Sequence, residues 1–276
     1  MTDAADPIAG SLPLLLVLLA AGAYGAGVLR LARRGDRWPR GAAVWFAVGL
    51  LAVLVGTADV LPGRGHPSGG QSFPQQIVSH LVVIMLAPTA LALGAPVTLW
   101  LRACRPGLRR RTLRLLSSRA ARWATLPPVV VLLDVTGLSA YYLTPLFATV
   151  HQHPALHALV HTHMFVTGFL VSWFVLGRDP GPRRGGLVAQ LSVLLATAVA
   201  HDVLAKLMYS RLLPAGAGTP DQIQAGAQLL YYGGDGLEVL TAAIVLTAWY
   251  RRGGRELDRQ RRRNASRPHA RAAGGN

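Results

Sequence analysis

The sequence predicts an all-α fold, a polytopic membrane helix bundle with seven transmembrane helices. Hydrophobic residues make up 51% of the chain and charged residues only 14%, whereas ordinary soluble proteins carry about 25% charged residues. The apolar residues also fall into seven long runs, and about 20 helical residues suffice to cross about 30 Å of hydrocarbon. Between these runs, arginine-rich connectors alternate with connectors that contain almost no basic residues.

Each predicted span is an apolar run long enough to cross a bilayer as a helix. The seven spans are Ile8–Leu31, Ala42–Leu61, Gln75–Leu101, Trp123–Leu146, Pro154–Gly177, Leu187–Leu212 and Ala225–Tyr250. Asp3 and Asp6 precede the first run where a cleaved signal peptide has basic residues, so we expect this run to remain as a span. Pro154 suits the first turn of a helix and favours a start there for the fifth span.

The predicted transmembrane domain covers residues 1–250. We expect residues 251–276 to form a basic, disordered cytoplasmic tail, because they include almost no apolar side chains that a packed core would need. No internal repeat is visible in the sequence, and no run of residues has the composition of a separate water-soluble catalytic domain.

The basic residues predict the orientation of the bundle. The first, third and fifth connectors and the C-terminal tail together hold 25 arginines, whereas the other connectors hold only Arg64 and Arg211. Because cytoplasmic connectors are enriched in basic residues, the N-terminus is predicted outside and the C-terminus in the cytoplasm.

The net charge of +16 is concentrated beside apolar spans. Membrane lipid with anionic headgroups therefore explains it better than nucleic acid, which we do not expect as a partner.

Polar and ionisable residues inside the predicted spans are the candidates for function, because such residues are costly in hydrocarbon. Eight of the nine histidines are expected in the outer half of the bundle or near its midplane, the exception being His269 in the tail. The candidate metal ligands in spans 3, 5, 6 and 7 are His80, Met85, His157, His161, His163, Met164, His201, Met208 and Asp235.

The fifth span contains the densest group of these candidates. His157 and His161 are one helical turn apart and share a face. Met164, seven residues after His157, lies on the same face, whereas His163 is rotated by about 200° from His161. Imidazoles together with a thioether suit a soft or borderline metal such as copper. The alternative is that these histidines form hydrogen bonds with backbone or water inside the bundle.

Four segments in spans 3 to 7 resemble CtaG-type cytochrome c oxidase assembly proteins of bacteria in their order and spacing. The segments are His80-Leu-Val-Val-Ile-Met85-Leu-Ala-Pro88 with Leu93-Gly-Ala-Pro96, His157-x-x-x-His161-x-His163 with Gly177-Arg-Asp179-Pro180, His201 with Met208, and Asp221-Gln222 with Gly234-Asp235. The chain departs from the family pattern at Gln76, where a histidine is common, at Asp235 in place of glutamate, and at Tyr231 in place of tryptophan. Either His161 or His163 matches the family's histidine.

The resemblance implies a multi-pass protein of the bacterial cell membrane that assists assembly of an aa3- or caa3-type oxidase. Its expected partners are cytochrome c oxidase subunits, and its expected cargo is copper bound by the outer-side histidines and methionines. We do not expect an enzyme, since the sequence has no serine or cysteine nucleophile motif and no HExxH pattern. The alternative functions are a copper or small-solute permease and a heme-binding membrane protein with two histidine ligands.

Overall fold

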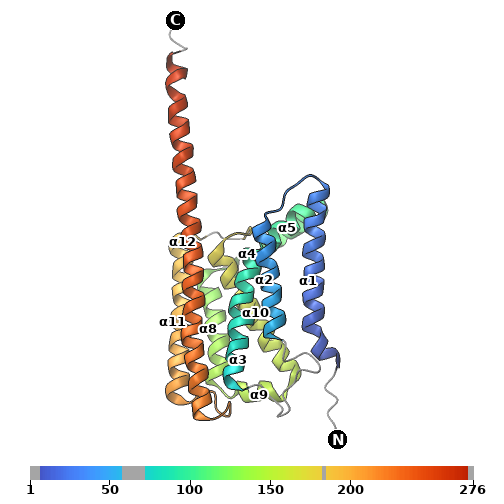
Figure 1. Ribbon diagram of the computed structural model, residues 1–276, viewed down its shortest axis with the longest axis vertical. Helices are drawn as coiled ribbons and strands as arrows, with labels where there is room; N and C mark the ends of the chain where they lie inside the picture. The colour runs from blue at the N-terminus through green and yellow to red at the C-terminus, as the bar shows by residue number, and fades with distance from the viewer. Residues whose placement is uncertain (1–6, 58–71, 182–184, 273–276) are drawn as a thin grey trace.

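The computed structural model describes residues 7–57, 72–181 and 185–272, and every regular element in these ranges is a helix. The helices are α1 (Pro7–Arg33), α2 (Arg40–Gly56), α3 (Phe73–His80), the π-helix η2 (Leu81–Leu86), α4 (Ala87–Leu93), α5 (Pro96–Ala103), α6 (Pro106–Leu116), α7 (Arg119–Ala124), α8 (Pro127–Leu143), α9 (Leu146–Gln152), α10 (Pro154–Leu176), α11 (Leu187–Arg211) and α12 (Pro220–Ala272). The longer helices lie side by side in a bundle, from which the C-terminal part of α12 projects (Figure 1). The predicted all-α class is confirmed.

Five helices in the described ranges are long and apolar enough to cross a membrane, and a sixth span is possible where two helices meet at a bend. The five are Pro13–Arg33, Phe73–Leu93, Pro154–Leu176, Leu187–Arg211 and Pro220–Gln260. The protein is therefore a multi-pass membrane protein by length and composition. A count of seven spans, and the orientation of the termini, stay predictions.

The second predicted span corresponds to α2, which has 17 residues. At about 1.5 Å per residue such a helix is about 25 Å long, which is less than the hydrocarbon thickness of about 30 Å. The last residues of this predicted span, 58–61, lie outside the described ranges, as does His66.

The third predicted span ends earlier than the sequence indicated, at Leu93 instead of Leu101. The chain turns at Ala95, which has a left-handed backbone with φ of 50°, and α5 begins at Pro96 in a new direction. Proline disfavours a helical residue before it, so the helix ends ahead of Pro96.

Asp179, which follows α10, holds the start of α5. Its carboxylate accepts hydrogen bonds from the backbone N–H groups of Val97 (3.1 Å) and Thr98 (2.7 Å) and from the Thr98 hydroxyl (2.6 Å). Burial raises the pKa of Asp179 above its ordinary value, although these hydrogen bonds act in the opposite direction. Asp179 thereby connects the end of α10 to the start of α5 at one end of the bundle.

Most of the fourth predicted span corresponds to α8, after which the chain bends by 80° into α9. Thr144 is extended and Pro145 has no N–H to continue the helix, so α8 ends at Leu143. α9 lies across the end of the bundle opposite to the projecting part of α12 (Figure 1). It adds His151 to the histidines that the sequence places at this end.

The last helix continues beyond Tyr250, into the residues for which a disordered tail stays a prediction. α12 is 53 residues long, and its final part extends away from the bundle (Figure 1). The residues after Tyr250 include many arginines, which are good helix formers. Glu256 and Arg259 also lie 3.8 Å apart one turn along the helix.

Large apolar side chains cover the outer surface of the bundle as well as its interior. Leu18 and Leu51 are each 59% exposed, and Leu195 is 65% exposed. A soluble protein rarely exposes contiguous apolar surface of this kind, whereas lipid accommodates it without cost. Inside, aromatic residues such as Phe73 and Tyr142 pack with Met208 in the half of the bundle near α9.

Candidate functional site

The helix that contains His80 changes its winding immediately after this residue. Pro88 has no N–H, so the Ile84 carbonyl four residues earlier lacks its helical donor, and the wider π-helical turn of η2 accommodates this gap. Gly168 on α10 lies directly against that carbonyl, where a Cβ atom would overlap the oxygen. The glycine therefore allows α10 to approach η2 closely, next to His80.

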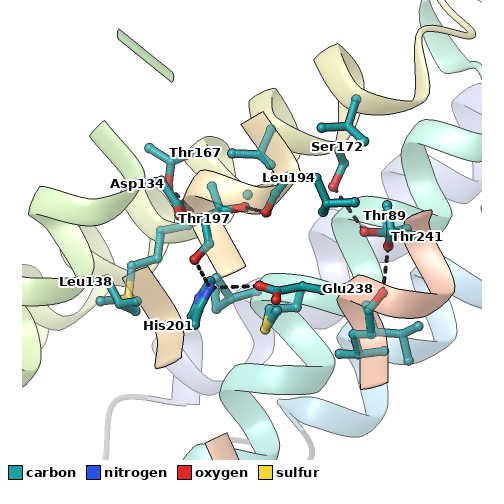
Figure 2. Close-up of a pocket in the computed structure, with 18 of the residues that line it drawn as sticks. Thr89, Asp134, Leu138, Thr167, Ser172, Leu194, Thr197, His201, Glu238 and Thr241 are labelled. Atoms are coloured by element: carbon teal, nitrogen blue, oxygen red, sulfur yellow. Dashed lines mark hydrogen bonds and ion pairs between the residues drawn. The ribbon is translucent and has the colours of Figure 1, made fainter. Parts of the chain in front are cut away.

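This crossing forms one wall of a cavity of about 70 Å³ inside the bundle, which we call the inner cavity. Side chains from η2, α8, α10, α11 and α12 also line it (Figure 2). The lining side chains with nitrogen, oxygen or sulfur atoms are His80, Met85, Thr89, Asp134, Met164, Thr167, Ser172, Thr197, His201, Glu238 and Thr241. No arginine or lysine is among the described residues that line the inner cavity.

His201 is held in a fixed orientation by two groups on one side of its ring. Its Nδ1–H donates to the Thr197 carbonyl (3.0 Å), and the same nitrogen lies 3.1 Å from Oε1 of Glu238 (Figure 2). One hydrogen cannot serve both acceptors well, and Oε1 receives no hydrogen bond of good geometry from the described residues. With Nδ1 protonated, Nε2 presents its lone pair. Metal-binding histidines commonly have this arrangement, in which the other ring nitrogen donates to a carbonyl or carboxylate.

His80 faces the same cavity and is only 6% exposed. Its Nε2 atom is buried and has no hydrogen-bond partner in the described part of the chain. The ring centres of His80 and His201 are 6.5 Å apart. A buried ring nitrogen without a partner is costly, so Nε2 of His80 is a group that a water molecule or a cation in the cavity would stabilise.

Nitrogen and oxygen ligands alone do not form a metal site here. Within residues 7–57, 72–181 and 185–272, no three His, Cys, Asp or Glu side chains lie close enough together to hold a metal ion. Met85 and Met164 supply sulfur to the same cavity as the two histidines. Two imidazoles with thioether sulfur are a donor set that fits Cu(I) and does not fit hard cations such as Mg²⁺.

A second group of histidines, which we call the outer histidine cluster, consists of His151, His157 and His161. The rings of His157 and His161 are stacked with centres 4.0 Å apart, and His151 lies 6.2 Å from His157. Nδ1 of His151 donates to the Phe147 carbonyl (2.7 Å) and Nδ1 of His161 to the His157 carbonyl (3.0 Å). These bonds leave Nε2 of both rings as the nitrogen that can bind a ligand.

A continuous series of ring contacts joins the outer histidine cluster to the inner cavity. Tyr141 lies 5.8 Å from His161 and 4.8 Å from Tyr142, measured between ring centres. Tyr142 in turn lies 5.9 Å from His80. Both tyrosines are buried. Two side chains of α8, Tyr141 and Tyr142, therefore connect the two groups of histidines.

Three predicted ligands lie outside these two groups. Nε2 of His163 is 3.3 Å from the Leu133 carbonyl and its ring packs against Gly137 on α8. Met208 is fully buried in the apolar core and does not line the inner cavity. Asp235 does not line the inner cavity and lies near Asp202 and Lys206 of α11.

Glu238 and Asp134 occupy the inner cavity although neither was among the predicted ligands. A signal for Glu238 was present in the sequence, because apolar or small residues recur every three or four positions on one face of α12, and the structure shows that these positions are buried. That series includes Ile223, Ala227, Leu230, Gly234, Glu238, Thr241 and Val245. Helical spacing therefore places Glu238, and not Asp235, on the face that packs into the bundle.

A model of the cytochrome c oxidase caa3 assembly factor family (Caa3_CtaG) matches residues 22–252. Uncharacterized proteins of Mycobacterium bovis and Mycobacterium tuberculosis are each 35% identical over 193 residues, which is 67% of this chain and 28% of theirs. An uncharacterized protein of Mycobacterium leprae is 30% identical over 185 residues, 64% of this chain and 28% of its own. The chain thus spans little more than a quarter of the length of these relatives. No solved structure matches it.

Proposed function

The chain belongs to the cytochrome c oxidase caa3 assembly factor family, and from this premise we propose that it assists oxidase assembly by carrying Cu(I) in the inner cavity. Copper is the cargo in this proposal, taken up on the side of the outer histidine cluster and released to an oxidase subunit. Membership of the family implies a role without catalysis. The observation that supports copper most strongly is the unpartnered, buried Nε2 of His80 opposite His201.

The chemistry of the donors favours Cu(I) over other cations. His80 and His201 offer imidazole nitrogen, and Met85 and Met164 offer thioether sulfur in the same cavity. Soft ligands of this kind select Cu(I), and neutral ligands allow release when a partner offers better ones. Glu238 supports the site by holding the ring of His201 in place.

The charge of the inner cavity also favours a cation. Asp134 and Glu238 bring two carboxyl groups into it, and the described lining includes no arginine or lysine to neutralise them. A carboxylate in a medium of low dielectric constant is stable only beside positive charge or strong hydrogen bonds. A bound Cu(I) ion supplies such a charge.

The outer histidine cluster is suited to exchange copper with a partner. His151 is exposed and His157 half-buried, so a ligand from another protein can approach them. The series through Tyr141 and Tyr142 brings the cluster close to His80. In the predicted orientation this end of the bundle faces outward, on the side where the family resemblance expects the oxidase to receive copper.

The two alternative functions have less support. Ligand sites for larger molecules occupy about 300–1,000 Å³, so the inner cavity of about 70 Å³ is too small for heme. A permease needs polar groups on both sides of the midplane. The outer histidine cluster lies at the end that α9 covers, whereas the described charged residues that line a cavity at the opposite end are arginines, which repel a copper cation.

The first experiment measures Cu(I) binding by the purified protein in detergent, under reducing conditions, in competition with a chromophoric chelator. We expect the wild-type chain to bind stoichiometric Cu(I) and the double variant His80→Leu/His201→Leu to lose this binding. The matched control is His163→Leu, which removes a histidine that lies outside the inner cavity and should retain full binding. Equal binding by the wild type and the double variant would refute the copper site.

The second experiment tests oxidase assembly in a strain that lacks the gene for this chain, complemented with the same variants. Heme a absorbance and copper content of the isolated oxidase are the readouts. We expect His163→Leu to restore the oxidase and the double variant to yield oxidase depleted of copper. Full oxidase from the double variant would show that the inner cavity is not needed for assembly.

A further inference from the structure

A second cavity, of about 540 Å³, lies at the end of the bundle from which α12 projects. It is half open and is lined by α2, by the last residues of α4 and α10, and by α12, and we call it the basic-end cavity. Four arginines line it: Arg178 after α10, and Arg251, Arg252 and Arg255 on α12. The remainder of its lining is mainly apolar, with Trp45, Leu176 and Ile244 among the largest side chains.

The four arginines have no acidic partner among the described residues. The ion pairs in those residues that involve arginine join Arg102 to Asp36 and Arg259 to Glu256. Asp179 follows Arg178 directly, but its oxygens accept hydrogen bonds from the start of α5. The cavity therefore concentrates positive charge that the described residues do not neutralise.

Arg178 is held at the wall of the cavity by one hydrogen bond. Its Nη1 donates to the Leu93 carbonyl (2.8 Å), the last residue of α4. A guanidinium group has five N–H donors, so most of them remain available to an acceptor. Arg251 and Arg255 are one turn apart on the same face of α12, so like charges face one another there.

From this combination of charge and apolar surface, we propose that the basic-end cavity binds one anionic phospholipid molecule. The phosphate headgroup lies between Arg178 and the arginines of α12, where guanidinium groups donate paired hydrogen bonds to its oxygens. An acyl chain extends along Trp45, Leu176 and Ile244. The cavity is far larger than a free phosphate ion needs, and its apolar wall gives such an ion no partner.

The position of the cavity agrees with a lipid ligand. The arginines lie where the apolar part of α12 ends at Tyr250, which is the depth at which lipid headgroups begin. Basic pockets between helices at the membrane surface are suited to acidic headgroups. This proposal does not depend on copper, because none of its residues lines the inner cavity.

The test compares phosphatidylglycerol with phosphatidylcholine, each added to delipidated protein in detergent. Native mass spectrometry counts bound lipid, and the thermal unfolding temperature reports stabilisation. We expect the wild type to retain one phosphatidylglycerol and to gain stability, with no comparable effect of phosphatidylcholine. The variant Arg251→Gln/Arg252→Gln/Arg255→Gln should bind about 100-fold more weakly, since each arginine near a headgroup contributes about fivefold.

The matched control is Arg109→Gln/Arg110→Gln/Arg111→Gln, which removes the same charge from exposed residues of α6. It should bind phosphatidylglycerol as the wild type does. Ala248 lines the cavity, so Ala248→Phe reduces its apolar space without changing a charge, and should also weaken binding. Should the triple variant fail to fold, Arg251→Gln and Arg255→Gln singly provide the test, each with about fivefold weaker binding expected.

Three results would overturn the proposal. Equal weakening by both triple variants would show that general surface charge attracts the lipid. Stabilisation by inorganic phosphate alone, or its displacement of phosphatidylglycerol, would indicate a site for free anions. Unchanged binding in Ala248→Phe would exclude an acyl chain from the cavity.

Discussion

The inner cavity and the basic-end cavity share three helices and have opposite charge. α4, α10 and α12 contribute to both, and α12 places Glu238 in the first and Arg251 in the second. These two residues are 13 positions apart, or about 20 Å along the helix. Among the described lining residues, the inner cavity has two carboxyl groups and no arginine or lysine, whereas the basic-end cavity has four arginines and no acid.

The difference shows how position along one helix determines the ligand that each cavity can hold. Near the middle of the bundle, a charged side chain is stable only with a counter-charge close by, so the inner cavity favours a small cation. At the end of the bundle, arginines reach the headgroup region and an apolar wall remains beneath them. That combination favours an amphiphilic anion.

Among the variants that test the difference between the two cavities, we expect the largest effect, a loss of Cu(I) affinity, from removing the negative charge of Glu238. We predict that Glu238→Gln weakens Cu(I) binding about 10- to 100-fold, the usual cost of changing a group that orients a ligand histidine. The amide keeps the shape but no longer attracts the Nδ1–H of His201 as strongly. Chelator competition at fixed pH measures the change.

Asp235→Asn is the control for this prediction. It removes one carboxylate from α12 only three residues away, outside the inner cavity. Cu(I) affinity should be unchanged in this variant. A greater loss from Asp235→Asn than from Glu238→Gln would mean that the face of α12 has been assigned wrongly.

A smaller effect, on stability, is expected at the wall of the inner cavity. The Cβ of Gly168→Ala would overlap the Ile84 carbonyl, so α10 and η2 must separate. We predict destabilisation of about 1–3 kcal/mol, as for other overpacked sites, seen as a lower thermal unfolding temperature. Gly22→Ala in α1 meets nothing within 4 Å and should be neutral or slightly stabilising. Equal stability of both variants would show that the close crossing is not needed.

Much of the fold could be predicted from hydropathy and charge, because each apolar run has to form a helix in lipid. The breaks inside the runs were harder to predict. Pro145 is visible in the sequence, but whether the chain bends there by 80° depends on how α9 packs across the bundle. Pro88 gives a similar ambiguity, since a π-helical turn and a simple kink both accommodate a missing N–H.

The sequence predicted the types of residue in the candidate site, but only some of the individual residues that line the inner cavity. Depth and spacing selected His80, His201, Met85 and Met164, which all line the inner cavity. Asp235 was chosen because it is an ionisable residue inside the predicted seventh span, while the burial pattern of α12 places Glu238 inside the bundle. Whether these side chains bind metal stays a prediction.

The fifth span shows what helical periodicity cannot predict. Periodicity indicated that His161 and His163 point in different directions, but not which of them faces the histidines of other helices. Tertiary packing decides this, because Gly137 on α8 leaves room for the ring of His163. His161 instead stacks with His157.

The most direct test of the central claim is X-ray absorption at the copper edge of the Cu(I)-loaded protein. The account predicts imidazole nitrogen together with at least one sulfur ligand, from His80, His201 and the methionines of the inner cavity. This spectrum should persist in His163→Leu and disappear in His80→Leu/His201→Leu. A spectrum without sulfur and imidazole, or one that is unchanged in the double variant, would contradict the claim that the inner cavity carries copper.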